Sequence, residues 1–187
     1  MFLDIGVGIL SAMFVSWHFD IPLTFWLVSA GIMFALLPDI DFVFYFFETD
    51  KITGYKHRNL IHNPLLFVPA GAILIGLLFG EIFAVLFTIA SFLHFVNDSF
   101  GIGRGVRWLY PFSKNGYAFG YLHSRQLKWG LWKPVFIFDE KYIREFDEIH
   151  GDRDWIKNIY FQPHIFSIFE YVIFIVSIIG LYFYVRK

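Results

Sequence analysis

The chain has 187 residues, of which 57% are hydrophobic and 22% aromatic, and its formal net charge is −1. Only 17% of the residues are charged, whereas a soluble domain has about a quarter, so we expect an integral membrane protein. The absence of Cys excludes disulfide bonds and thiolate metal sites. Any metal must therefore be held by His and carboxylate side chains.

Five apolar segments follow one another along the chain. They cover residues 5–17, 21–38, 65–80, 82–98 and 165–185. A membrane-spanning helix needs roughly 17–25 residues, so the first segment should begin at Phe2. The amino terminus has no basic region and no small-residue cleavage site, and we expect no cleavable signal peptide. The predicted fold class is all-α, a polytopic membrane protein with about five transmembrane helices.

Residues 99–163 form a polar and aromatic insert before the last apolar segment. Within the insert, KYIREFDEIHGDRDWIKNIYF (141–161) alternates charged and bulky apolar residues at helical spacing. This pattern fits an interfacial helix, and it fits a solvated helix of a small globular insert equally well. The predicted domains are a four-helix membrane core over 1–98, the insert over 99–163 and a fifth transmembrane helix over 164–187.

The positions of Lys and Arg predict the orientation in the membrane. Five crossings place every Lys and Arg except Arg186 and Lys187 on the side that carries the amino terminus, the 48–63 loop and the insert. Basic loops stay in the cytoplasm. We therefore predict cytoplasmic loops and a cytoplasmic amino terminus, with the carboxyl terminus outside.

Carboxylates lie near the cytoplasmic ends of the first two segments. LLPDIDF places Asp39 and Asp41 after Pro38, which should kink or end the second helix. An extended D-x-D stretch would aim both carboxylates the same way. Asp4 reaches the same depth, although the helix dipole alone also favours a carboxylate near a helix start.

Histidines complete the pattern at the third and fourth segments. HRNLIHNP holds His57 and His62 in a loop, with Asn63 as a plausible N-cap and Pro64 at the favoured first helical position. The fourth segment ends in SFLHFVND, where His94 and Asp98 are four residues apart. Two residues at this spacing are separated by about 40° around the helix axis, so their side chains project from the same face and can bind one ion.

Seven side chains thus converge on one membrane face as candidate metal ligands. They are Asp4, Asp39, Asp41, His57, His62, His94 and Asp98. Any one of them could instead serve the structure, and Asp39 could simply pair with Arg58. Their common depth favours a functional site, because ionisable residues inside membrane segments usually mark one.

The other ionisable residues are not predicted to be metal ligands. His18 and Asp20 fall on the opposite face and are excluded, whereas Glu170 is close enough to the site to support it as a further carboxylate. The histidines in or beside the insert are expected on the surface; they are His123, His150 and His164. GIGRG (101–105) is too short to be a nucleotide-binding fingerprint and no strand is expected before it, so we interpret it as a flexible turn. Arg104 in this turn and Arg107 just after it are suited to holding a phosphate.

Four motifs resemble a known family in order and approximate spacing. LLPDIDF, HRNLIH, HFVND and GVRWLYPFS, spread over residues 1–120, are similar to the YdjM-like proteins of the DUF457 group. These are described as predicted metal-dependent hydrolases of the inner membrane. The resemblance therefore implies a prokaryotic inner (cytoplasmic) membrane and a hydrolytic reaction.

This chain departs from the family's motifs at several positions, and Asn59 stands where the second motif has Gly. The family's P-D-x-D-H motif corresponds to 38–42, with Phe42 in place of His, and its H-R-G-x-T-H motif corresponds to 57–62. Asp4 stands where the family has an early His. A looser similarity, in the order of the ligands, is to helical zinc-dependent phospholipase C proteins, and it favours phosphoester chemistry.

These observations predict a metal-dependent hydrolase that acts on a phosphoester of a lipid or other amphiphile at the cytoplasmic face. One or two divalent ions are expected, Zn²⁺ first and Mn²⁺ or Fe²⁺ as alternatives. Asp39, Asp98 and Arg58 are the predicted catalytic residues, and Arg104 and Arg107 would bind the substrate anion. The expected partners are the bilayer and that substrate, with no nucleic acid.

Two alternatives come from other classes of protein. A membrane protein that uses metal only for stability or binding would carry the same ligands without turnover. A metal transporter fits less well, since it would place ligands near the midplane along a path between both faces.

Overall fold

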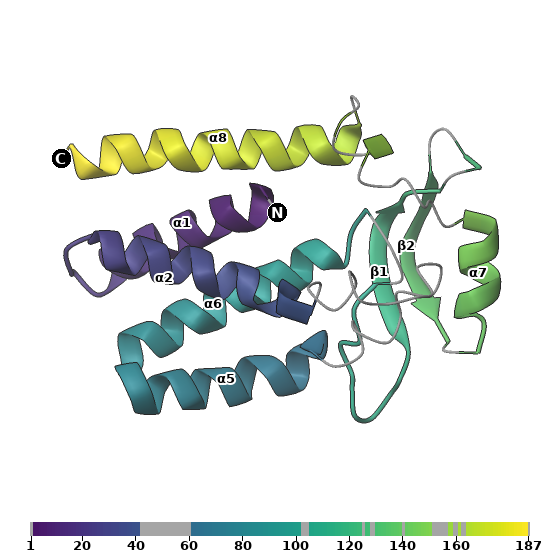
Figure 1. Cartoon of the computed structure of the whole chain (residues 1–187), viewed down its shortest axis with the longest axis horizontal. Helices are drawn as coiled ribbons and strands as arrows, with labels where there is room; N and C mark the ends of the chain where they lie inside the picture. Colours follow the sequence, from purple (N-terminus) through teal and green to yellow (C-terminus); the bar gives the residue numbers. More distant parts are fainter. Residues whose placement is uncertain are drawn as a thin grey trace. The chain divides into compact units, whose positions relative to one another are not determined.

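The computed structural model describes residues 2–41, 61–101, 105–124, 126–127, 130–139, 141–150, 157–158, 161 and 164–186. Most of these residues are helical (Figure 1). The helices are α1 (Phe2–His18), α2 (Phe25–Leu36), the 3₁₀ helix η1 (Leu37–Asp41), α5 (Pro64–Phe79), α6 (Glu81–Asp98), α7 (Ile143–His150) and α8 (Ile165–Val185). The strands β1 (Gly116–Leu122) and β2 (Leu131–Phe138) form one antiparallel hairpin. The mostly helical class agrees with the sequence prediction, whereas the hairpin was not predicted.

Two of the described helices, α6 and α8, are long and apolar enough to cross a membrane. The other apolar helices are shorter and cover Phe2–His18, Phe25–Ile40 and Pro64–Phe79. Five crossings therefore stay a prediction.

The chain folds into two compact units. The first contains residues 1–38, 68–94 and 163–187, and the second contains residues 39–67 and 95–162. Helices α5 and α6 each supply residues to both units. The predicted domains, with boundaries after residues 98 and 163, stay a prediction.

Close packing of α1 against α2 is a feature of the first unit. A Cβ atom on Gly8 would lie 2.5 Å from the Cα atom of Ile32, and a Cβ atom on Gly31 would collide with the carbonyl oxygen of Gly8. Small residues at facing positions let two helix backbones approach closely, as is common in membrane helices. Neither position therefore has room for a side chain.

Gly8→Ala is expected to lower the free energy of unfolding by about 1–3 kcal/mol, because the added methyl group forces two backbones apart. The matched control is Gly180→Ala in α8, where the new Cβ atom would lie 3.5 Å from Met13 Cε, an ordinary contact. Thermal unfolding of both variants in the same detergent measures the difference. Equal stability of the two variants would contradict the close α1–α2 packing.

The end of α2 differs in part from the expectation. The helix ends at Leu36 and Pro38 lies in η1, so the predicted helix break at the proline is confirmed. The prediction of an extended D-x-D stretch is wrong, because residues 37–41 form a 3₁₀ turn. With three residues per turn, positions 39 and 41 lie about 240° apart around the axis and do not share a direction.

The second unit contains the hairpin and α7. The register runs from Gly116 opposite Phe138 to Leu122 opposite Leu131, with an irregularity at 119–120. Pro134 lies at this irregularity, opposite no residue, where its missing N–H costs no ladder hydrogen bond. Helix α7 lies within the segment 141–161 that was predicted to be helical, and its interfacial position stays a prediction.

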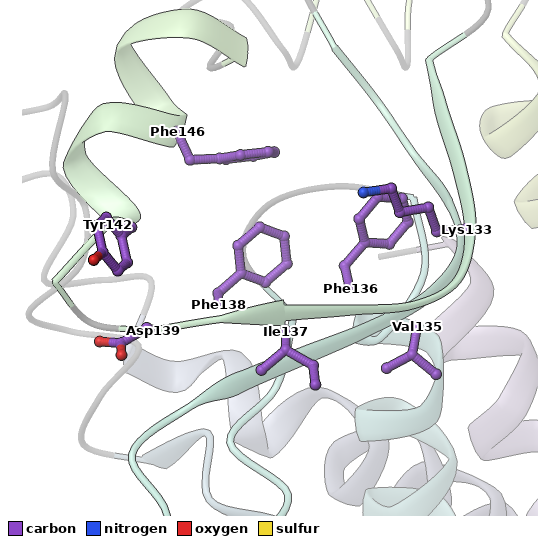
Figure 2. Close-up of a pocket in the computed structure, with 8 residues that line it drawn as sticks. All are labelled: Lys133, Val135, Phe136, Ile137, Phe138, Asp139, Tyr142 and Phe146. Carbon is purple, nitrogen blue, oxygen red and sulfur yellow. The ribbon is translucent and has the colours of Figure 1, made fainter.

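The hairpin has a small core of its own, made by Ala118, Leu122, Phe136 and Phe138 with Leu131 and Phe146 packed against it. Figure 2 shows the ring of Phe146 reaching from α7 towards β2, where Phe136 and Phe138 project on the same side. The rings of Phe138 and Phe146 are 4.9 Å apart at their centroids and meet edge to face. This aromatic contact attaches α7 to the hairpin.

Candidate metal site

Four of the seven predicted ligands come together. They are Asp39, His62, His94 and Asp98, and each offers one ligand atom within 4.8 Å of the others. Three of them belong to the second unit, and His94 stands one turn before Asp98 on the continuous helix α6. His94 and Asp98, which were predicted to share one helix face, thus lie in a cluster that also contains Asp39 of η1 and His62, two residues before α5.

His62 lies close to both carboxylates of this cluster. Its Nε2 atom is 3.1 Å from Asp98 Oδ2 and 3.6 Å from Asp39 Oδ1. The residue stands two positions before Pro64, where α5 begins as predicted. Its ring meets the ring of Phe95 edge to face with centroids 5.8 Å apart, so a neighbouring residue of α6 fixes the imidazole plane.

Burial separates the imidazoles from the carboxylates. The side chains of His62 and His94 are 5% and 0% exposed, whereas those of Asp98 and Asp39 are 19% and 42% exposed. The imidazoles therefore form the closed side of the cluster. Solvent reaches it from the side of the carboxylates.

Asp4 occupies a different place from the other predicted ligands. Its Oδ1 atom lies 3.0 Å from Nδ1 of His94, and the Asp4 side chain is 2% exposed. It is not one of the four clustered residues. A histidine that binds metal through one nitrogen commonly donates the N–H of the other to a carboxylate, which is the position Asp4 holds.

The donor set fits a transition metal. Two imidazoles and two carboxylates without thiolates suit Zn²⁺, Mn²⁺ or Fe²⁺. Ligand atoms about 2.0–2.1 Å from a tetrahedral ion are about 3.3 Å from one another. The measured separations of 3.1 and 3.6 Å around His62 Nε2 lie on either side of that value.

Several predicted site residues cannot be placed relative to the cluster. His57, Arg58 and Arg104, together with the side chain of Asp41, lie outside the described residues. Arg107 is described and is partly buried. The role of each of these residues stays a prediction.

The histidines that were set aside have other neighbours. His18 stacks on Phe14 at the end of α1, with ring centroids 5.7 Å apart. Nδ1 of His150 lies 2.9 Å from Ser124 Oγ, and Nδ1 of His164 accepts a hydrogen bond from the backbone N–H of Phe166 at the start of α8. None of the three belongs to the metal cluster.

The second unit also holds a cavity of about 300 Å³ beside β2. Its lining comes from β2, α7 and the turn between them: Lys133, Val135, Phe136, Ile137, Phe138, Asp139, Tyr142 and Phe146 (Figure 2). It contains none of the predicted site residues, and mainly apolar side chains line it. The clustered His and Asp residues are the stronger candidate for chemistry.

Fold and cluster together define a mostly helical protein with candidate membrane spans and a group of Asp and His side chains that could hold a metal ion. A family model described as YdjM inner membrane protein matches residues 4–186. The chain therefore belongs to the YdjM inner membrane protein family, which confirms the resemblance seen in the motifs and indicates a membrane location. Neither the curated proteins nor the solved structures gave a match.

Proposed function

We propose that this protein is a metal-dependent hydrolase that cleaves a phosphoester of a lipid or other amphiphile at the cytoplasmic face of the membrane. The observation that carries the proposal is the cluster of Asp39, His62, His94 and Asp98. Buried imidazoles and partly exposed carboxylates give it one closed and one open side. The partly exposed carboxylates are where water and a substrate headgroup would reach the cluster.

A divalent ion bound there would lower the pKa of a coordinated water and stabilise negative charge that develops on a phosphoester. The chain's own residues have separate tasks. His62 and His94 supply neutral nitrogen donors from the buried side. Asp98 and Asp39 compensate the positive charge and, being partly exposed, can take up a proton from an entering water.

The substrate anion is assigned to the basic residues that lie close to the ligands in the sequence. Arg58 lies between His57 and His62, and Arg104 and Arg107 follow Asp98 by six and nine residues. Guanidinium groups bind phosphate oxygens in pairs of hydrogen bonds. A lipid headgroup at the interface would present such oxygens while its acyl chains stay in the bilayer.

One observation favours a second candidate, a site that binds metal only for stability. Four protein ligands are enough to complete a tetrahedral shell, and structural zinc sites are usually closed in this way. Catalytic sites instead keep a position open for water. Metal-dependent turnover of a phospholipid by the purified protein would separate the two candidates, since a closed structural site would bind metal without turnover.

The cytoplasmic location of the site predicts a labelling pattern. Single Cys residues at Lys51 and Lys133 are expected to be shielded from an impermeant thiol reagent in intact cells, whereas a Cys at Lys187 is expected to be labelled. The native chain has no Cys and thus no background. Permeabilised cells, in which all three positions should react, are the control. Labelling of both loops but not of the terminus would place the loops on the other face.

A further inference from the structure

The first unit buries three ionisable side chains among apolar helices. Asp4 in α1, His94 in α6 and Glu170 in α8 are at most 2% exposed. Buried charged groups are costly unless they are paired or hydrogen-bonded. The arrangement of these three therefore calls for a specific role.

Asp4 and His94 form the tightest contact of the three. The 3.0 Å separation joins a carboxylate oxygen to Nδ1, and the two residues are 90 positions apart in the sequence. An ionised carboxylate can only accept, so the pair is stable when Nδ1 of the neutral imidazole carries the hydrogen. In that tautomer the lone pair is on Nε2, the nitrogen on the opposite side of the ring.

The start of α1 is itself fixed to α8. The backbone N–H of Leu3 points to Glu170 Oε2 at 3.5 Å, and a carboxylate at a helix amino terminus is favoured by the helix dipole. The ring of Phe2 packs against the rings of Tyr171 and Phe174 with centroids 5.1 and 5.6 Å away. These contacts are made by the two residues just before Asp4, so they attach the helix turn that carries Asp4 to α8.

We propose that Asp4 is a positioning residue that holds the metal-binding tautomer of His94, with Glu170 and its neighbours on α8 anchoring the helix turn that carries it. Asp4 then acts through His94 and is not itself a ligand. The inference rests on the proposed metal site. It assigns different work to two carboxylates that the sequence pattern treats alike, since Asp39 would touch the ion and Asp4 would not.

The first test reads the tautomer without metal. In metal-free protein with ¹⁵N-labelled histidine, His94 is expected to show hydrogen on Nδ1, and its signals are assigned by their loss in His94→Gln. Asp4→Ala removes the acceptor and should shift the population towards hydrogen on Nε2. Asp4→Asn keeps a side-chain oxygen acceptor, folds more readily and should retain the wild-type tautomer in part. Asp39→Asn, which does not alter the Asp4 contact, should leave it unchanged.

The second test measures Zn²⁺ affinity of the same variants by competition with a chelator. Loss of a carboxylate that orients a histidine ligand typically weakens metal binding by about 10–100-fold, which we expect for Asp4→Ala, with a smaller loss for Asp4→Asn. An unchanged tautomer and unchanged affinity in Asp4→Ala would overturn the positioning role. The positioning role would also be overturned if Asp4→Asn lost as much Zn²⁺ affinity as His94→Ala, because such a loss would identify Asp4 as a ligand. A wild-type protein that binds no Zn²⁺ would overturn the proposed function itself.

Discussion

Replacing His94 with alanine is expected to reduce Zn²⁺ affinity by more than about 100-fold. Loss of a residue that only orients a metal ligand already lowers metal affinity by about 10–100-fold, and loss of the ligand itself should cost more. His94 is fully buried and its helix also carries Asp98. No solvent molecule can easily take over the coordination position that the imidazole leaves. Elemental analysis of purified protein should give one to two ions per wild-type chain and a sharply lower content in His94→Ala.

Matched variants separate ligand loss from general damage. Asp39→Ala should also lose metal. His18→Ala and His150→Ala should keep it, because His18 stacks on Phe14 and His150 contacts Ser124, away from the cluster. Removing one partner of a buried ionic group also lowers stability, so folding is checked by size exclusion and thermal unfolding. Metal retained in both His94→Ala and Asp39→Ala would remove the cluster as the binding site.

The parts of the site that could be predicted are those fixed by local geometry. His94 and Asp98 are four positions apart in α6, which places them on one helix face. Pro38 and Pro64 mark where helices end and begin near Asp39 and His62. Each of these rules acts over a few residues. The predicted five-crossing topology then related segments far apart in the sequence, because it assigned the ionisable residues at these helix ends to one membrane face, where such residues usually mark a functional site.

The work of Asp4 could not be deduced in the same way. Sequence gives a carboxylate at the right depth but does not say whether it faces an ion or the second nitrogen of a histidine. That choice is set by contact between α1 and α6, which are about 90 residues apart at the pair concerned. The one available signal is general: a histidine ligand usually needs a carboxylate behind it.

The hairpin was missed for a related reason. Strand β2 contains Pro134, which in sequence argues against a strand, and β1 contains two glycines, Gly116 and Gly120. In the structure the proline lies where the ladder is already interrupted next to Gly120. Local propensity was overridden by an irregularity that appears only when both strands are aligned.

Asp98→Asn is expected to lower metal-dependent phosphoester hydrolysis by at least about 100-fold, within the range of about 10²–10⁴ that a positioned acid or base contributes. The carboxylate of Asp98 is partly exposed and lies 3.1 Å from His62 Nε2, so it belongs both to the ligand cluster and to its open side. The amide of Asn keeps the size and can still coordinate, but it no longer takes up a proton. Wild type and variant, both metal-loaded in nanodiscs, are compared on a phospholipid panel and on a soluble chromogenic phosphodiester.

Arg107 provides the control that distinguishes substrate binding from metal chemistry. Arg107→Ala should raise KM with little change in metal content, because this residue is assigned to the substrate anion; Arg107→Lys should recover only part of the loss, since an ammonium lacks the paired donors. Uniform loss of binding leaves kcat nearly unchanged, whereas Asp98→Asn lowers kcat. If the metal-loaded wild type turns over no phosphoester while the ion stays tightly bound, the hydrolase proposal fails. The four ligands would then serve stability, as a closed tetrahedral shell would allow.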